Sequence, residues 1–288
     1  MKKIALLILV ACSSMKAQYI FYTCDKSEIK KIKNDTLYII PTGDKVFDDS
    51  LVLAVKKYWT ICPSIAIKMN QVDKFLSTED KYLIAPTKGG GVDYTYIASP
   101  LKESSARQVQ IFFGGKHKGI RMGNNKTRLC YTPLPFYDQK NAASCLSIVI
   151  KNLNDDVDLV ITKQLKSLGG YSWDALRKEI NKNTKIAKTK TLLINEKSMF
   201  FLPEDVWKKY KFKYEVMDED KIIAIINSDK KNEYCYIDYI ANKNVIIVDL
   251  ATFSLIYFSD PDISPLKNRF SENEMDRLNS FVSGNPGK

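Results

Sequence analysis

The chain has 288 residues, of which 45% are hydrophobic and 27% are charged. This composition excludes a disordered polymer and indicates one large or two ordinary globular domains. The formal net charge is +11, and most of the cations are lysines. Arginine is the residue preferred for bidentate contacts to phosphates and bases. A lysine excess spread along the whole chain therefore argues against a nucleic-acid partner.

The N-terminal stretch 1–18 begins with Lys2 and Lys3, followed by an apolar run over 4–11 and then small residues, which is the layout of a bacterial secretory signal. The run is too short to span a bilayer. The sequence before Cys12 fits a lipobox, which would make Cys12 a lipid-anchored N-terminus, but the resulting leader would be short. We favour cleavage after Ala17 and predict an exported protein of the periplasm, outer membrane or medium, with membrane attachment only if Cys12 is lipidated.

A repeat organises the rest of the chain. TLYII at 36–40 returns as TLLIN at 191–195, KKY at 56–58 returns at 208–210, and an Asp-Lys pair at 73–74 returns at 220–221. The spacings between copies differ only by short loop changes, so they indicate a duplicated supersecondary unit rather than a solenoid. We expect 36–85 and 191–239 to share one strand order.

Each copy alternates short apolar runs with helical patterns, which implies crossover connections and parallel strands. The predicted helix of the first copy is capped by Asp48 or Asp49, and that of the second starts with Pro203 in its first turn. A capping box from Ser271 to Glu274 opens a last helix. The predicted strands are 36–40, 64–69, 82–85, 94–98 and 109–113 in the first copy, and 191–194, 212–217, 234–239, 245–250 and 255–258 in the second.

Between the copies, apolar positions from 146 to 168 keep a helical period, which predicts one long helix or two helices broken near Asn154. The predicted fold class is α/β, with two tandem, internally duplicated β-α-β-α-β units that have mixed sheets and are joined by a helical segment. The predicted division is a signal peptide at 1–18, a first unit at 19–135, a helical connector at 136–186, and a second unit with a C-terminal helix at 187–288.

In this plan, with a KKY-containing helix after a TL-type strand repeated behind a secretion leader, the chain resembles uncharacterised secreted α/β proteins of Bacteroidota. The resemblance covers the two copied stretches. It implies an envelope location, and it implies no known activity, cofactor or catalytic residue.

Five cysteines follow the leader, so at least one of them cannot form an intrachain disulfide. Disulfides persist outside the cytosol, where an exported protein resides. Cys130 and Cys145 bracket a Pro-rich loop, so either a disulfide or two buried thiols fits that pair. None of the cysteines has the spacing of metal ligands. They are Cys24, Cys62, Cys130, Cys145 and Cys235.

The sequence offers no catalytic signature. The single histidine, His117, excludes a zinc site built on several histidines, and no nucleophile elbow is present. The Gly-rich stretches 89–91 and 119–127 lack the order of a Walker loop. A cysteine nucleophile paired with His117 stays open, because such partners meet in space. We predict no catalytic residue, no metal site and no cofactor.

One loop gathers cations among glycines and lies outside the repeated plan. It is the candidate anion-binding site, for an anionic envelope polymer or another envelope protein, and a solvated loop is the alternative. Its members are Lys116, His117, Lys118, Arg121, Lys126 and Arg128.

The sequence therefore predicts a non-enzymatic exported envelope protein used for binding or assembly. The alternative is a secreted hydrolase with its site between the two units, since pockets favour domain junctions. A deep cleft at the junction would favour the hydrolase, and a filled junction would favour the binding module.

Overall fold

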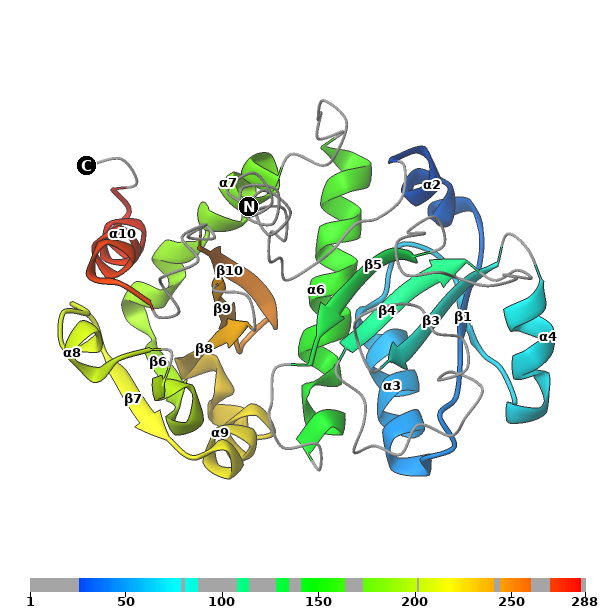
Figure 1. Cartoon of the computed structure of the whole chain (residues 1–288), viewed down its shortest axis with the longest axis horizontal. Helices are drawn as coiled ribbons and strands as arrows, with labels where there is room; N and C mark the ends of the chain where they lie inside the picture. The colour runs from blue at the N-terminus through cyan, green and yellow to red at the C-terminus, as the bar shows by residue number, and fades with distance from the viewer. Residues whose placement is uncertain are drawn as a thin grey trace, which may run out of the picture.

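A computed structural model describes residues 26–78, 81–87, 108–113, 128–134, 141–163, 173–200, 202–240, 244–259 and 270–285. Figure 1 shows two β-sheets on opposite sides of the central helix α6 (Ala142–Thr162). Within the described ranges, no helix is long and apolar enough to cross a membrane. Several predicted features lie outside the described residues: the leader with Cys12, the strand at 94–98, and the loop cations Lys116, His117, Lys118, Arg121 and Lys126.

The first sheet has five strands in the order β2-β1-β3-β4-β5. β1, β2 and β3 are parallel, and β4 and β5 are added antiparallel, so the sheet is mixed. The elements are α2 (Lys26–Lys31), η1 (Ile32–Asn34), β1 (Leu37–Ile39), α3 (Lys45–Tyr58), β2 (Ser64–Ala66), η2 (Met69–Gln71), α4 (Val72–Ser77), β3 (Tyr82–Thr87), β4 (Gln108–Phe113) and β5 (Arg128–Pro133).

The second sheet also has five strands, in the order β10-β9-β8-β6-β7. β6, β7 and β8 are parallel, and β9 and β10 are antiparallel. The elements are β6 (Thr191–Asn195), η6 (Glu196–Phe200), α8 (Glu204–Trp207), β7 (Tyr214–Met217), α9 (Glu219–Ile226), η7 (Asp229–Glu233), β8 (Tyr234–Ile240), β9 (Asn244–Asp249), β10 (Ser254–Phe258) and α10 (Glu272–Ser283).

The two sheets have the same topology. The first strand of each copy lies between the second and third, and two antiparallel strands follow, so the predicted common strand order is confirmed. The pairing register agrees as well, because Leu37 lies opposite Ser64 and Tyr82, and the equivalent Leu192 lies opposite Tyr214 and Cys235. The chain is an α/β protein of two tandem, internally duplicated β-α-β-α-β units with mixed sheets, joined by a helical segment.

Helix ends differ from the sequence predictions in two places. Asp44 caps α3 and accepts from the Phe47 N–H at 3.0 Å. The predicted cap Asp48 lies inside the helix, where its carboxylate accepts from the Thr42 N–H at 2.7 Å and closes the preceding loop. Pro203 is the N-cap of α8, one residue before the predicted first turn. Both shifts arise because a cap depends on where the chain enters the helix, which the tertiary structure decides.

The C-terminal helix α10 matches its predicted start. The Ser271 side chain accepts from the Glu274 N–H at 3.4 Å, and the Glu274 carboxylate accepts from the Ser271 N–H at 2.6 Å. The helix ends at Gly284 with φ at 82°, a left-handed conformation that glycine adopts without a steric penalty.

The connector contains a single unbroken helix of 21 residues, α6, followed by α7 (Trp173–Asn181) and η5 (Thr184–Thr189). The alternative of a break near Asn154 is wrong. α6 packs along α3 and contacts β5 on the first-unit side and β10 on the second-unit side. One hydrophobic core runs through α6 and joins residues of both units, including the fully buried Val149 and Leu153 of the helix.

The predicted disulfide is absent for its two described cysteines. Cys130 on β5 and Cys145 on α6 are both thiols, and both are buried in the core shared by the two units. Burial raises the pKa of the Cys145 thiol, so the thiol stays protonated. The pair follows the other prediction, of cysteines that act as small apolar core residues.

Candidate functional site

The outer edge of β7 is open. The Leu192 N–H donates to the Lys213 carbonyl oxygen at 3.0 Å, and parallel strands use alternate residues for such bonds. The backbone N–H and C=O groups of Tyr214 and Val216 therefore face away from β6. Among the described residues these groups have no hydrogen-bond partner, and no strand lies beyond β7. The edge can accept another strand.

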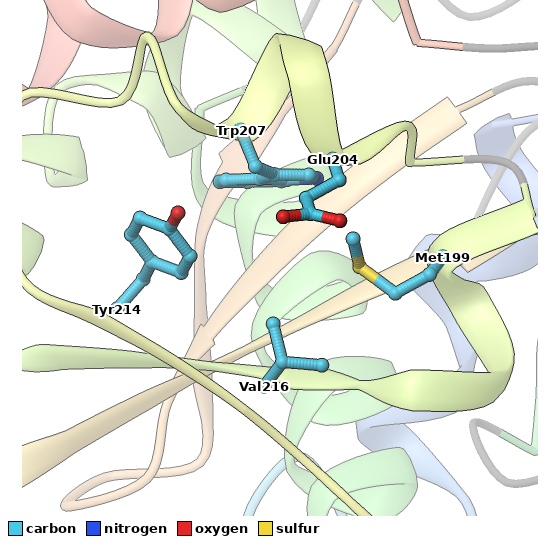
Figure 2. Close-up of a pocket in the computed structure, with 5 residues that line it drawn as sticks. All are labelled: Met199, Glu204, Trp207, Tyr214 and Val216. Carbon is cyan, nitrogen blue, oxygen red and sulfur yellow. The ribbon is translucent and has the colours of Figure 1, made fainter.

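A pocket of about 400 Å³ lies beside this edge, between β7, η6 and α8. Tyr214 and Val216, two positions apart on one face of β7, form one wall, and Met199, Glu204 and Trp207 form the rest (Figure 2). Figure 2 shows all five side chains converging on one space. Val216 is 44% exposed, which is high for a large aliphatic residue on a sheet. The pocket is thus mostly apolar, with one carboxylate.

Trp207 lines the pocket and is fully buried. Its ring stacks on Phe270 at 6.0 Å with an interplanar angle of 9°, and it meets Tyr210 edge-on at 5.5 Å. Within the described part of the chain, the Trp207 indole N–H and the Tyr210 hydroxyl are buried without a hydrogen-bond partner. Buried polar groups are normally paired, so these two are exceptions that need an explanation.

Glu204 places its carboxylate at the rim, where the side chain is 72% exposed. Its ion pair is with Lys208, one helical turn further on, at 3.3 Å. Exposed pairs of this kind contribute about 0.3–0.5 kcal/mol. The Glu204 carboxylate is therefore available to a ligand at small cost.

Met199 is positioned by a buried carboxylate behind η6. Glu219 is 3% exposed, and its oxygens accept from Asn141, the N-cap of α6, at 3.1 Å and from Asn195 of β6 at 3.4 Å. Asn195 in turn accepts from the Lys197 N–H at 3.0 Å, and the Lys197 ammonium lies 3.5 Å from Glu219. These bonds hold the start of η6 against β6, so they fix the segment that carries Met199 into the pocket.

The first unit has apolar residues at the equivalent positions. The strand register and the repeated Asp-Lys pair match Ile40 with Asn195, Val72 with Glu219, and Ala85 with Asp238. All six residues are buried. The carboxyl ends of the parallel strands therefore close over an apolar core in the first unit and over a polar cluster in the second.

The opposite edge of the second sheet is covered. The Asn181 side chain donates to the Phe258 carbonyl oxygen at 3.0 Å and accepts from the Phe258 N–H at 2.8 Å, as a neighbouring strand would. The Thr184 hydroxyl donates to the Ile256 carbonyl oxygen at 2.7 Å. Asn181 at the end of α7 and Thr184 at the start of η5 thus satisfy the outward groups of Phe258 and the Ile256 carbonyl oxygen, and the described residues provide no such cover for β7.

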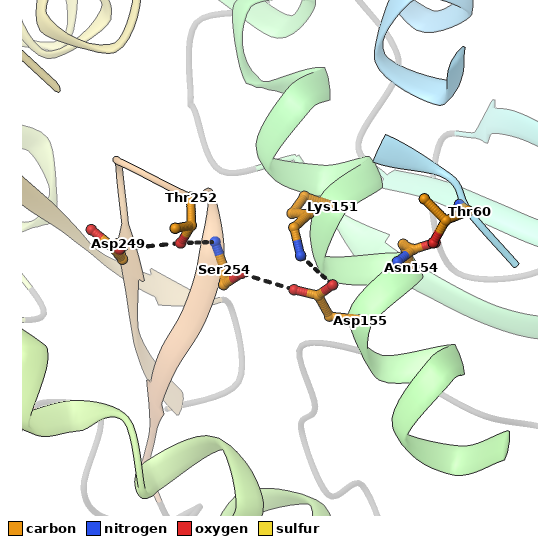
Figure 3. A network of polar contacts seen from close by, with 7 residues as sticks. All are labelled: Thr60, Lys151, Asn154, Asp155, Asp249, Thr252 and Ser254. Carbon is orange, nitrogen blue, oxygen red and sulfur yellow. Dashed lines mark hydrogen bonds and ion pairs between the residues drawn. The ribbon is translucent and has the colours of Figure 1, made fainter. Parts of the chain in front are cut away.

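The junction between the units, where the alternative function needs a cleft, is packed around α6. Asn154 accepts from the Thr60 N–H of the first unit at 2.7 Å, and Asp155 accepts from the Ser254 hydroxyl of the second unit at 2.9 Å (Figure 3). Lys151 pairs with Asp155 on the same helix. Burial, and to a lesser degree the Asp155 carboxylate, raises the pKa of Asp156 well above its usual range and favours its neutral form.

Few of the sequence-predicted site residues fall within the described chain. Arg128 begins β5, where its backbone lies opposite Phe112, and its five partners in the predicted cation cluster lie outside. His117 also lies outside, so its pairing with a cysteine stays a prediction. The described residues contain no group of three or more side chains suited to hold a metal ion.

The pocket and the Glu219 cluster are features that the sequence reasoning missed. The available signal was a difference between the copies, because TLYII ends in Ile40 and TLLIN ends in Asn195. A polar residue at a buried position, where the other copy has an apolar residue, indicates that the two copies differ in local structure and function there.

Comparison with known proteins identifies no relative, since no family model, no curated protein and no solved structure matches this chain.

Proposed function

We propose that this protein is a non-enzymatic, exported envelope protein that acts as a binding or assembly module, and that it captures an extended segment of another protein along β7. The open edge of β7 beside an apolar pocket carries this proposal. An added strand gains affinity from main-chain hydrogen bonds and specificity from pockets for alternate side chains. Tyr214 and Val216 supply both, because their backbone groups face outward and their side chains line the pocket.

The expected affinity of a captured segment depends on how many outward backbone groups of β7 it can pair with. Tyr214 and Val216 together offer two outward N–H and two outward C=O groups. A hydrogen bond within a protein has a net contribution of about 1 kcal/mol. Four such bonds sum to about 4 kcal/mol, the binding free energy of a millimolar complex, before the entropic cost of association is subtracted. Burial of Val216 and of a side chain in the pocket must supply the rest, so pocket contacts decide which segments are captured.

An envelope protein suits this site better than an anionic polymer, because a strand edge recognises peptide backbone. The cation cluster remains a separate proposal for polymer binding. The alternative function, a secreted hydrolase, is less well supported. Its site was expected between the units, and there the described residues form a continuous core around α6.

The test is selection of random displayed peptides on the full chain and on the variant Val216→Pro. Proline removes the outward N–H at 216 and no hydrogen bond to β6, so the fold tolerates it at an edge. The matched control is Ala66→Pro, at the position equivalent to Val216 on the edge strand β2. We expect peptides that bind the wild type and the control but not Val216→Pro.

Amide hydrogen exchange locates the bound peptide. The amides of Tyr214 and Val216 should exchange rapidly in the free protein and become protected when a selected peptide binds. Selected peptides that bind Val216→Pro as well as the wild type, or that leave both amides unprotected, would refute strand capture at β7.

A further inference from the structure

We infer that the segment captured by β7 places a lysine or arginine side chain in the pocket beside the strand; this inference rests on the proposed function. The residues that line the pocket differ in burial and in polarity. The apolar Trp207 is fully buried and the apolar Met199 is half-buried, whereas the Glu204 side chain, with its carboxylate, is 72% exposed. A side chain that fits this order has an apolar stem and a cationic head, which describes lysine and arginine.

The Glu204 carboxylate provides the charge complementarity. Its pair with Lys208 is between two highly exposed side chains, 72% and 69% exposed, and a cation on the captured segment can replace Lys208 as the partner. The captured segment covers the Glu204 side chain, so the new charge-assisted hydrogen bond is less exposed to solvent than the pair with Lys208 and is stronger. An acidic side chain would instead meet the like charge of Glu204.

The aromatic wall also favours a cation. Tyr214 is half-buried and faces the same space as Glu204 in Figure 2. The face of an aromatic ring attracts ammonium and guanidinium groups, and a guanidinium also stacks on it. The pocket therefore offers a cation two different attractive groups.

Other charges on β7 do not oppose this arrangement. Successive side chains of a strand alternate between faces, so Lys213 and Glu215 project away from the face that carries Tyr214 and Val216. The same alternation applies to the captured segment, in which only every second side chain can face the pocket. One cationic position, flanked by unconstrained neighbours, is the expected signature.

The experiment uses the displayed peptides that require an unmodified Val216. We expect lysine or arginine to be enriched at one position among them. A synthetic copy of one such peptide, with that residue replaced by norleucine, keeps the stem and loses the charge. We expect its Kd to rise about tenfold, which corresponds to the loss of one charge-assisted contact.

The matched protein variants are Glu204→Gln and Asp205→Asn. Both residues are exposed on α8, and of the two only Glu204 lines the pocket. Glu204→Gln should weaken the cationic peptide about tenfold and leave the norleucine peptide unchanged, and Asp205→Asn should change neither by more than about twofold. Calorimetry measures the affinity of both peptides for the wild type and for each of the two variants.

Two negative results are distinguishable. Capture that requires Val216 but shows no enrichment of lysine or arginine would refute the cationic side chain and leave strand capture supported. An unchanged affinity of Glu204→Gln for the cationic peptide would have the same meaning. If no selected peptide depends on Val216, the proposed function itself is wrong, and the inference fails with it.

Discussion

The two edge strands of the second sheet, β10 and β7, differ in whether their outward backbone groups have hydrogen-bond partners. On β10, Asn181 pairs with both backbone groups of Phe258, and Thr184 donates to Ile256. On β7, the equivalent groups of Tyr214 and Val216 have no partner among the described residues. Natural proteins protect edge strands because open edges recruit other chains. Among the described residues, the second sheet can therefore recruit a strand at β7 and not at β10.

The edge strand β2 of the first sheet provides a second comparison with β7. β2 occupies the same place as β7, and its outward residues Ser64 and Ala66 are the register equivalents of Tyr214 and Val216. Small side chains offer little surface to an incoming strand. The duplicated topology therefore decides where an edge lies, and the side chains on it decide whether it can select a partner. Four predictions test this comparison.

The largest expected effect is at the covered edge. Asn181→Leu leaves the N–H and C=O of Phe258 buried without partners, and each such group costs about 1–3 kcal/mol. We expect the free energy of unfolding in urea to fall by about 3 kcal/mol. Asn183→Leu, at an exposed position on the same segment, is the control and should change it by less than about 0.5 kcal/mol. An equal effect of both substitutions would show that Asn181 does not protect β10.

The next effect concerns the support of the pocket. Glu219→Gln keeps one acceptor oxygen and presents an amide N–H₂ to one of the two donors, Asn141 or Asn195, so we expect a loss of about 2 kcal/mol in unfolding free energy. Faster exchange of amides in η6 should accompany it, because Lys197 depends on Asn195. Glu215→Gln, on the exposed face of β7, is the matched control and should be neutral. If Glu219→Gln changes neither the unfolding free energy nor the exchange of the η6 amides, the buried cluster does not support the pocket.

A smaller effect tests the second contact that covers β10. Thr184→Val removes the hydroxyl that donates to the Ile256 carbonyl oxygen, and the unfolding free energy should fall by about 1 kcal/mol. Thr189→Val, exposed on the same helix η5, provides the comparison. No difference between the two variants would leave Asn181 as the sole protection of that edge.

The smallest effect is expected at the open edge itself. Val216→Pro should change the unfolding free energy of the unbound protein by less than about 0.5 kcal/mol, because no intrachain hydrogen bond is lost. Thermal unfolding of Val216→Pro and Ala66→Pro provides the measurement. A loss above about 2 kcal/mol would mean that the 216 N–H is already satisfied and that β7 is not an open edge.

Much of the fold could be predicted from the repeat. TLYII and TLLIN mark β1 and β6, the middle strands of the three parallel strands in each sheet, and the repeated Asp-Lys pairs mark the helices that precede β3 and β8. A shared order of landmarks implies a shared topology, since the same succession of strands and crossovers has few ways to pack. The capping box at Ser271 was also readable, because its two residues lie within one helical turn.

The candidate site could not be found in this way, because its residues meet only in the folded chain. Met199, Glu204 and Val216 come from three consecutive elements and lack any spacing typical of a ligand site. The burial of Glu219 depends on Asn141, which α6 brings from 78 residues earlier in the chain. The sequence left a disulfide and two buried thiols open for Cys130 and Cys145 for a related reason, since cysteine spacing sets a loop length and the core sets the side-chain environment.

The sequence by itself determined the α/β class, the duplication and the common strand order, because hydrophobic periodicity and repeated landmarks are local properties of the chain. Only the tertiary structure decided which edge is covered and which is open. Asn181 and Thr184 reach β10 because η5 and the end of α7 pass along it. Nothing in the described chain passes along β7, so Tyr214 and Val216 keep their backbone groups unpaired. Contacts between segments distant in sequence made that difference.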